Sequence, residues 1–123
     1  MSDVDSAGDQ RIPPLASAWA LARVRGPSMS PTVASGDLLM VRRVRDATSV
    51  RDGDVVLARF PARPELLVVK RVHHAVDGGH WVQGDNALVT DDSRAFGTAV
   101  VVGRVVGRLW PRPGPLRPAP AAG

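Results

Sequence analysis

Two residues of this chain stand in settings that favour catalytic chemistry, a serine at position 28 and a lysine at position 70. Ser28 lies in the segment GPSMSPT, between a Gly-Pro pair and a further proline, and the apolar run Leu38–Val41 follows it. Because glycine and proline bend the chain, Ser28 is expected on a turn that leads into a strand. A serine hydroxyl becomes a nucleophile only when a base removes its proton, and most turn serines are purely structural.

Lys70 is the single lysine among the sixteen basic residues, and all the others are arginine. Arginine keeps its proton in proteins, whereas a lysine that is removed from water can release one. The segment ELLVVKRVH, Glu65–His73, is rich in β-branched and aliphatic residues and is expected to form a strand. A lysine in such a strand is a candidate base for a serine nucleophile.

Strand alternation places Val68 and Val72 on the same face as Lys70, and Val69 and Arg71 on the opposite face. Apolar neighbours disfavour the charged ammonium, so this face favours a neutral amine that can accept a proton. The alternative is a lysine that extends its amine into solvent from an edge strand.

A third block, GDNALVTDDSRAFG at residues 84–97, follows a short hairpin. The three blocks, in this order, resemble those of bacterial type I signal peptidases, the Ser/Lys serine peptidases. The resemblance covers roughly Val24 to Pro111. It implies that Ser28 is the nucleophile and Lys70 its general base.

The same resemblance assigns supporting roles. Thr90 stands where family members usually carry a serine whose hydroxyl orients the lysine, and threonine keeps that hydroxyl. Asp92 and Arg94 match an ion pair that braces the catalytic loop. Gly84, Asp85 and Asn86 match the first turn of that loop.

One position departs from part of the family. Gly26 stands where some members have a serine that contributes a hydroxyl to the oxyanion hole. The backbone N–H of Ser28 can still donate there, whereas Pro27 has no N–H. The sequence therefore does not identify the second hydrogen-bond donor of the oxyanion hole.

Short apolar segments separated by Gly, Asp and Pro turns indicate an all-β domain with the signal peptidase/LexA-like catalytic β fold. We expect one compact domain at residues 15–111, flanked by a disordered N-terminal arm, 1–14, and a disordered Pro/Ala-rich tail, 112–123. Beside Glu65–His73, the expected strands are Leu38–Val44, Val55–Phe60, Trp81–Gln83 and one or two strands within Thr98–Leu109.

The chain is short for this family, and Leu15–Val24 is too short to cross a bilayer. Membrane contact is therefore not expected, and the prediction is a soluble cytoplasmic enzyme. This reduced form resembles the proteases that mature nickel-type superoxide dismutase, which implies the dismutase precursor as substrate and removal of its N-terminal leader as the reaction. The alternatives are a type I signal peptidase acting on secretory preproteins, a LexA-like self-cleaving domain, and a non-catalytic β-barrel binding module.

No cofactor is expected. The chain has no cysteine, which excludes thiol catalysis and zinc–thiolate sites. His73, His74 and His80 flank one hairpin, but His73 and His74 are expected on opposite faces of a strand, so no metal site is predicted. The net charge of +4 comes from scattered arginines with few aromatic residues, which does not favour nucleic-acid binding.

Overall fold

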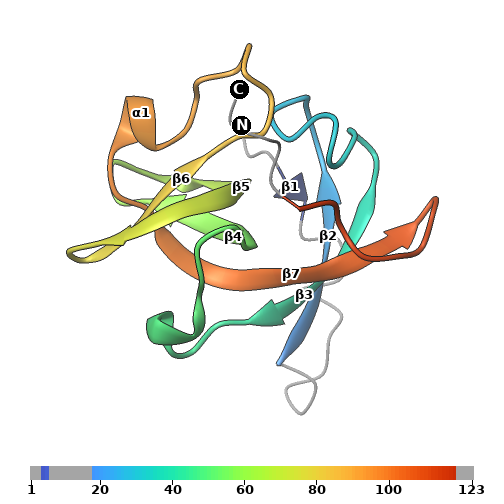
Figure 1. The fold of residues 1–123 in the computed structure, drawn as a ribbon, viewed down its shortest axis with the longest axis horizontal. Helices are drawn as coiled ribbons and strands as arrows, with labels where there is room; N and C mark the ends of the chain where they lie inside the picture. Colours follow the sequence, from blue (N-terminus) through green and yellow to red (C-terminus); the bar gives the residue numbers. More distant parts are fainter. Residues whose placement is uncertain (1–3, 6–17, 119–123) are drawn as a thin grey trace.

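The computed structural model describes residues 4–5 and 18–118. They form one antiparallel sheet with the strand order β1-β2-β3-β7-β4-β5-β6 (Figure 1). The strands are β1 Val4–Asp5, β2 Trp19–Val24, β3 Leu38–Arg43, β4 Val55–Phe60, β5 Arg63–Val76, β6 Gly79–Gln83 and β7 Val100–Trp110. The only α-helix in this part of the chain is the single turn α1, Ser93–Phe96, and Ala47–Ser49 form a 3₁₀ turn. The predicted all-β class is confirmed.

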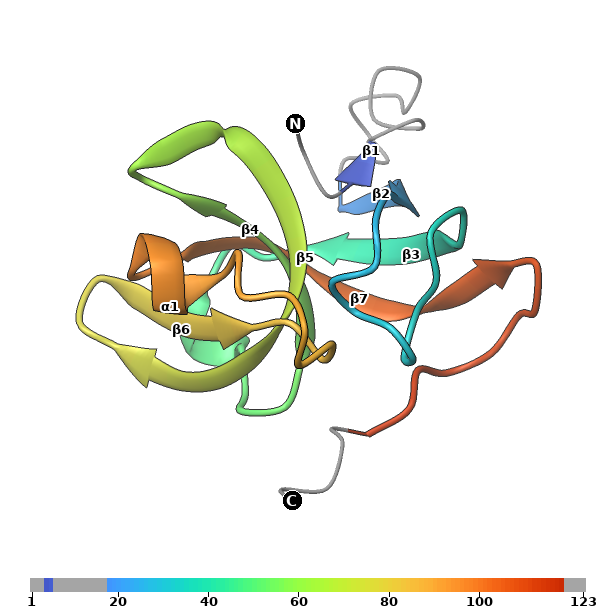
Figure 2. The same ribbon diagram turned by 90° about the horizontal axis from the view of Figure 1, so that it is seen from above.

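The sheet is strongly curled (Figures 1 and 2). Its buried side chains form two apolar clusters. Alternate residues of β4 face different clusters: Val55 and Leu57 pack in the first, while Val56 and Phe60 pack in the second. Strand β5 divides its side chains in the same way, as a period of two requires. The central strands are therefore buried on both faces, which explains their nearly continuous apolar sequences.

The second cluster lies in a small barrel. His80 of β6 exchanges two backbone hydrogen bonds with Ala99, which lies immediately before β7. Since β7 pairs with β4, β4 with β5 and β5 with β6, this bridge closes the ring. The β5–β6 hairpin, and with it Lys70, is thereby held at both edges.

Three segments outside the expected strands pair with the sheet. The part of the apolar segment 15–24 that the structure describes contains β2, which the sequence did not assign. Within the expected tail, Gly114 pairs with Arg108 of β7, and Leu116 packs against the first cluster. Within the expected arm, only Val4–Asp5 are described, and β1 pairs with β2 and also contacts β5. The rest of the arm and residues 119–123 lie outside the described residues.

The expectation that His73 and His74 point to opposite faces is wrong. The β5–β6 register shifts between Val72 and His74, and this irregularity breaks the alternation of side chains. Both rings are exposed and lie together, with their Nδ1 atoms 2.7 Å apart. No group of three or more potential metal-binding side chains occurs among the described residues.

Candidate active site

Ser28 lies in the turn that joins β2 to β3, residues 25–37, here called the Ser28 turn. Gly26 has φ of 84°, a left-handed conformation that glycine adopts without strain, and it starts the bend. Met29 and Val33 are fully buried in the first apolar cluster and anchor the turn. Ser28 itself is only 5% exposed, so its side chain is largely shielded from water.

The loop between β6 and α1, here called the 84–92 loop, holds the Ser28 turn by its backbone. The N–H of Asn86 donates to the carbonyl of Ser28 at 2.9 Å, and its side-chain amide donates to the carbonyl of Pro27 at 3.0 Å. Gly84 approaches so closely that a β-carbon there would stand 2.5 Å from the Ser28 carbonyl oxygen. Residue 84 is therefore glycine because no side chain fits between the loop and the turn.

Lys70 is 0% exposed and lies in β5, where it pairs with Val56 of β4. The predicted face is confirmed, since Val68 and Val72 pack in the second cluster and Val69 in the first. The pairing of β5 with β6 ends at Arg71 and Gln83. One position further along the same antiparallel register, Gly84 stands opposite Lys70. Gly84 thus lies between the strand that carries Lys70 and the turn that carries Ser28.

Asp92 fixes this loop from behind. Its carboxylate is fully buried and accepts hydrogen bonds from the N–H of Gly84, at 2.9 Å, and from Arg94, whose Nη2 lies 2.6 Å away. Burial alone would raise the pKa of Asp92, but the hydrogen bonds from the Arg94 side chain and from the two backbone amides outweigh it. The net result is an Asp92 pKa below its usual value, so the carboxylate stays ionised.

A second ion pair, which sequence reasoning missed, joins the Lys70 strand to the Ser28 turn. The guanidinium of Arg71 binds both carboxylate oxygens of Asp85, at 2.9 and 2.7 Å. Thr32 of the Ser28 turn donates a hydrogen bond to the same carboxylate. Arg71 also donates to the backbone carbonyls of Gly53 and Arg117. Its face of β5 was predictable, but its partner 14 residues along the chain was not.

Two predicted site residues are more peripheral. Thr90 is exposed in the 84–92 loop, and its carbonyl accepts the N–H of Asp92 at 2.9 Å. Gly26 donates its N–H to the hydroxyl of Ser35 at 3.2 Å. Gly26 therefore shapes the turn, while the backbone of Thr90 helps to place Asp92 in the 84–92 loop.

An antiparallel sheet that buries a serine and a lysine on either side of one loop points to a peptidase. The chain belongs to the Peptidase S24-like family, whose model matches residues 9–106. It is 33% identical to the mitochondrial inner membrane protease subunit 1 of Xenopus tropicalis, over 77% of this chain and 72% of that protein. It is also 33% identical to the mitochondrial ATP-independent inner membrane protease subunit 1a of Arabidopsis thaliana, over 72% and 68%. For the mitochondrial inner membrane protease subunit 2 of Danio rerio the identity is 33%, over 74% and 64%.

These relatives contradict the predicted cytoplasmic localisation, because they are named as subunits of proteases of the mitochondrial inner membrane. That prediction rested on the shortness of the apolar segment 15–24. The described part of this segment contains β2, whose alternate side chains are buried in the sheet, so its apolar character reflects packing and does not report where the protein acts. Within residues 4–5 and 18–118 no helix is long and apolar enough to span a bilayer.

Proposed function

We propose that the protein is a serine endopeptidase in which Ser28 is the nucleophile and Lys70 the general base. The observation that carries this proposal is the position of Gly84, in contact with the Ser28 backbone and next in register opposite the buried Lys70. The Ser28 hydroxyl attacks the scissile carbonyl, and the Lys70 amine accepts its proton. The backbone N–H of Ser28 donates to the oxyanion. The protonated amine then returns the proton to the leaving nitrogen, and water hydrolyses the acyl-enzyme.

Supporting residues act on the geometry of this pair. Thr90 orients the Lys70 amine through its hydroxyl, and Gly26 shapes the turn that presents the Ser28 N–H. Asp92 and Arg94 hold the 84–92 loop, and their contact with the N–H of Gly84 supports that role. Together they keep the reacting atoms aligned, which is the main requirement for efficient attack.

The substrate is a precursor whose N-terminal leader is removed. An extended peptide reaches both reacting residues by lying between β2, which leads into the Ser28 turn, and β5, which carries Lys70. The contacts of β1 with both strands support this route, because they show that the sheet accepts an extended segment there (Figure 2). The nickel-type superoxide dismutase precursor is the candidate supplied by the sequence resemblance, and a precursor presented at a membrane surface is the candidate favoured by the relatives.

The test is incubation of the purified protein with both kinds of precursor, followed by mass spectrometry of any new N-terminus. Ser28→Ala and Lys70→Arg should each abolish cleavage, since arginine cannot serve as the base. Lys70→Met provides an uncharged variant of similar length in case arginine does not fit the buried site. Ser30→Ala, two residues away, is the matched control and should cleave like the parent. Cleavage by folded Lys70→Arg or Lys70→Met protein would overturn the proposed pair.

A further inference from the structure

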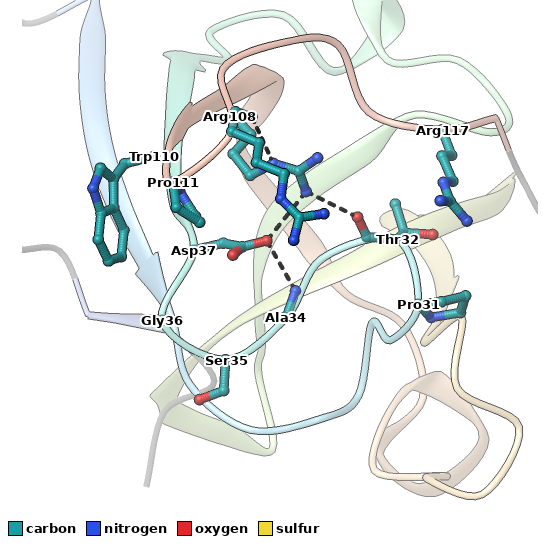
Figure 3. Close-up of a pocket in the computed structure, with 11 residues that line it drawn as sticks. Pro31, Thr32, Ala34, Ser35, Gly36, Asp37, Arg108, Trp110, Pro111 and Arg117 are labelled. Carbon is teal, nitrogen blue, oxygen red and sulfur yellow. Dashed lines mark hydrogen bonds and ion pairs between the residues drawn. The ribbon is translucent and has the colours of Figure 1, made fainter.

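A pocket of about 530 Å³ opens beside the Ser28 turn, outside the Ser28–Lys70 site (Figure 3). One side is formed by Pro31 and Thr32 of the turn, and the other by Trp110 and Pro111 at the end of β7. The tail closes it, because Gly114 pairs back onto Arg108 and brings the next residues over the turn. Segments far apart in sequence thus build one cavity.

The pocket is lined by three arginines and one carboxylate, namely Arg108, Arg112, Arg117 and Asp37. Asp37 is already paired with Arg108, since its Oδ2 accepts from Arg108 at 3.1 Å and from the N–H of Ala34 at 3.0 Å (Figure 3). Arg108 is satisfied too, because it also donates to backbone carbonyls of Thr32 and Arg112.

The other two guanidiniums are not neutralised. Within the described residues, neither Arg112 nor Arg117 forms an ion pair with an acidic side chain. Both are exposed, so they can rearrange around an incoming group. A guanidinium presents paired N–H donors that match a carboxylate, and two of them lining one pocket favour an anionic ligand.

The neighbouring aromatic residue narrows the ligand class. Trp110 is 56% exposed, and the guanidinium of Arg23 lies 5.7 Å from the centre of its ring. The indole offers an apolar surface on one side of the pocket, and Arg117 lies on the opposite side, near Pro31 and Thr32 (Figure 3). An extended peptide that carries acidic residues beside an apolar one fits this combination, whereas a small inorganic anion would leave the indole unused.

The location ties the pocket to the peptidase site. Thr32 follows Ser28 by four residues, so the two lie within about 14 Å along the chain. Thr32 also donates to Asp85, which Arg71 holds next to the Lys70 strand. We propose that this pocket is a second recognition site, which binds an acidic segment of the polypeptide substrate a few residues from the scissile bond. This inference rests on the proposed peptidase function.

Binding is measured with full-length Ser28→Ala protein, so that the result does not depend on cleavage. The probes are the synthetic peptides AELEA and AQLQA, which differ only in two carboxylates, titrated by calorimetry at low and at physiological salt. We expect AELEA to bind at least about 10-fold more tightly than AQLQA at low salt. The preference should weaken as salt is added, because exposed charges are screened.

The double variant Arg112→Gln with Arg117→Gln should lose about 10-fold in affinity for AELEA and leave binding of AQLQA unchanged. Arg45→Gln is the matched control, because it removes one exposed arginine beyond the far end of β3 and should change neither affinity. With a cleavable precursor, the double variant should raise KM for an acidic sequence and leave kcat unchanged. Equal affinity for the two peptides, or an unaltered preference in the double variant, would overturn the inference whether or not the protein cleaves. If the unaltered protein cleaves no precursor but the Ser28→Ala protein still prefers AELEA over AQLQA, only the peptidase function would be refuted.

Discussion

Gly84 lies against Ser28 with no room for a methyl group between them: a β-carbon at residue 84 would be 2.5 Å from the Ser28 carbonyl oxygen. Gly84→Ala must therefore displace the Ser28 turn or the 84–92 loop. We expect kcat to fall by about 100-fold or more, because misplacement of a reacting group by roughly 1 Å has an effect of that size. The measurement is kcat for a precursor, together with a thermal melt.

The control for this change is Gly103→Ala in β7, whose β-carbon would stand 2.5 Å from a side-chain methyl group of Val41 in β3. It should lower the melting temperature but leave kcat of the folded protein near that of the parent. Equal losses of kcat in both variants would show that the close contact at residue 84 matters only for stability.

Asp92 should make stability depend on pH on the acid side. Its folded-state pKa is depressed, so the unfolded chain takes up a proton at higher pH than the folded one. The stabilisation is fully present above the unfolded pKa of about 3.9 and is lost as pH falls through the folded pKa. Asp92→Asn should lower the free energy of unfolding by about 2–3 kcal/mol at pH 7. The gap between variant and parent should shrink in urea titrations as pH falls below about 4, and a constant gap would refute the linkage.

The pair of Arg71 and Asp85 should be more important for stability than any exposed pair. Both side chains are nearly buried, so Asp85→Asn leaves a charge without a partner and should cost about 3–5 kcal/mol in urea unfolding. It should also lower activity, since the same carboxylate holds Thr32. Glu65→Gln is the control, because its pair with Arg63 is exposed to solvent and should contribute little to the free energy of unfolding. Similar losses from both changes would contradict this ranking.

Thr90 should affect rate and not stability. If its hydroxyl orients the Lys70 amine, Thr90→Val should lower kcat by about 10–100-fold, which corresponds to a lost positioning bond of roughly 1.5–3 kcal/mol. Thr90→Ser keeps the hydroxyl and should be nearly silent. If the valine variant had the kcat of the parent, a role of the Thr90 hydroxyl in orienting Lys70 would be excluded.

Strand β1 should compete with substrate. It pairs with β2 and contacts β5, which are the two strands between which an extended substrate is proposed to lie. The double variant Val4→Pro with Asp5→Pro removes two backbone N–H groups and should lower KM several-fold at constant kcat. The control, Val4→Thr with Asp5→Asn, keeps the backbone N–H groups and should have the KM of the parent. If KM fell equally in the control and in the double proline variant, competition through strand pairing would be excluded.

The sequence predicts local features of this fold well. The alternation around Lys70 identifies its buried face, because a strand has a fixed period of two. The same rule failed at His73 and His74, where the β5–β6 register shift interrupts that period and leaves no clear mark in the sequence. Strand β2 was missed because Trp19–Val24 is a nearly continuous apolar run, interrupted only by Arg23, in a segment considered only as a possible membrane span.

Contacts between distant segments were not predictable from periodicity. The bond from Thr32 to Asp85 joins residues 53 positions apart, and only the folded sheet brings them together. The arginine pocket has the same origin, since it combines the Ser28 turn with the end of β7 and the tail. For Ser28, Lys70 and Asp92, the resemblance to a known family supplied the roles. The structure adds their burial, the hydrogen bond of Asn86 to Ser28 and that of Gly84 to Asp92.

The order in which the strands are synthesised differs from their order in the sheet. Strand β7 is the last strand of the described chain, yet it lies between β3 and β4 and pairs with both. During translation, β3 and β4 must therefore wait with one edge each unpaired until residues 100–110 have left the ribosome. Unpaired strand edges promote association between chains. Translation that stops before Val100 should therefore yield aggregation-prone fragments in place of a weakened enzyme, and production of the intact protein should benefit from slow synthesis or from chaperones that cover strand edges.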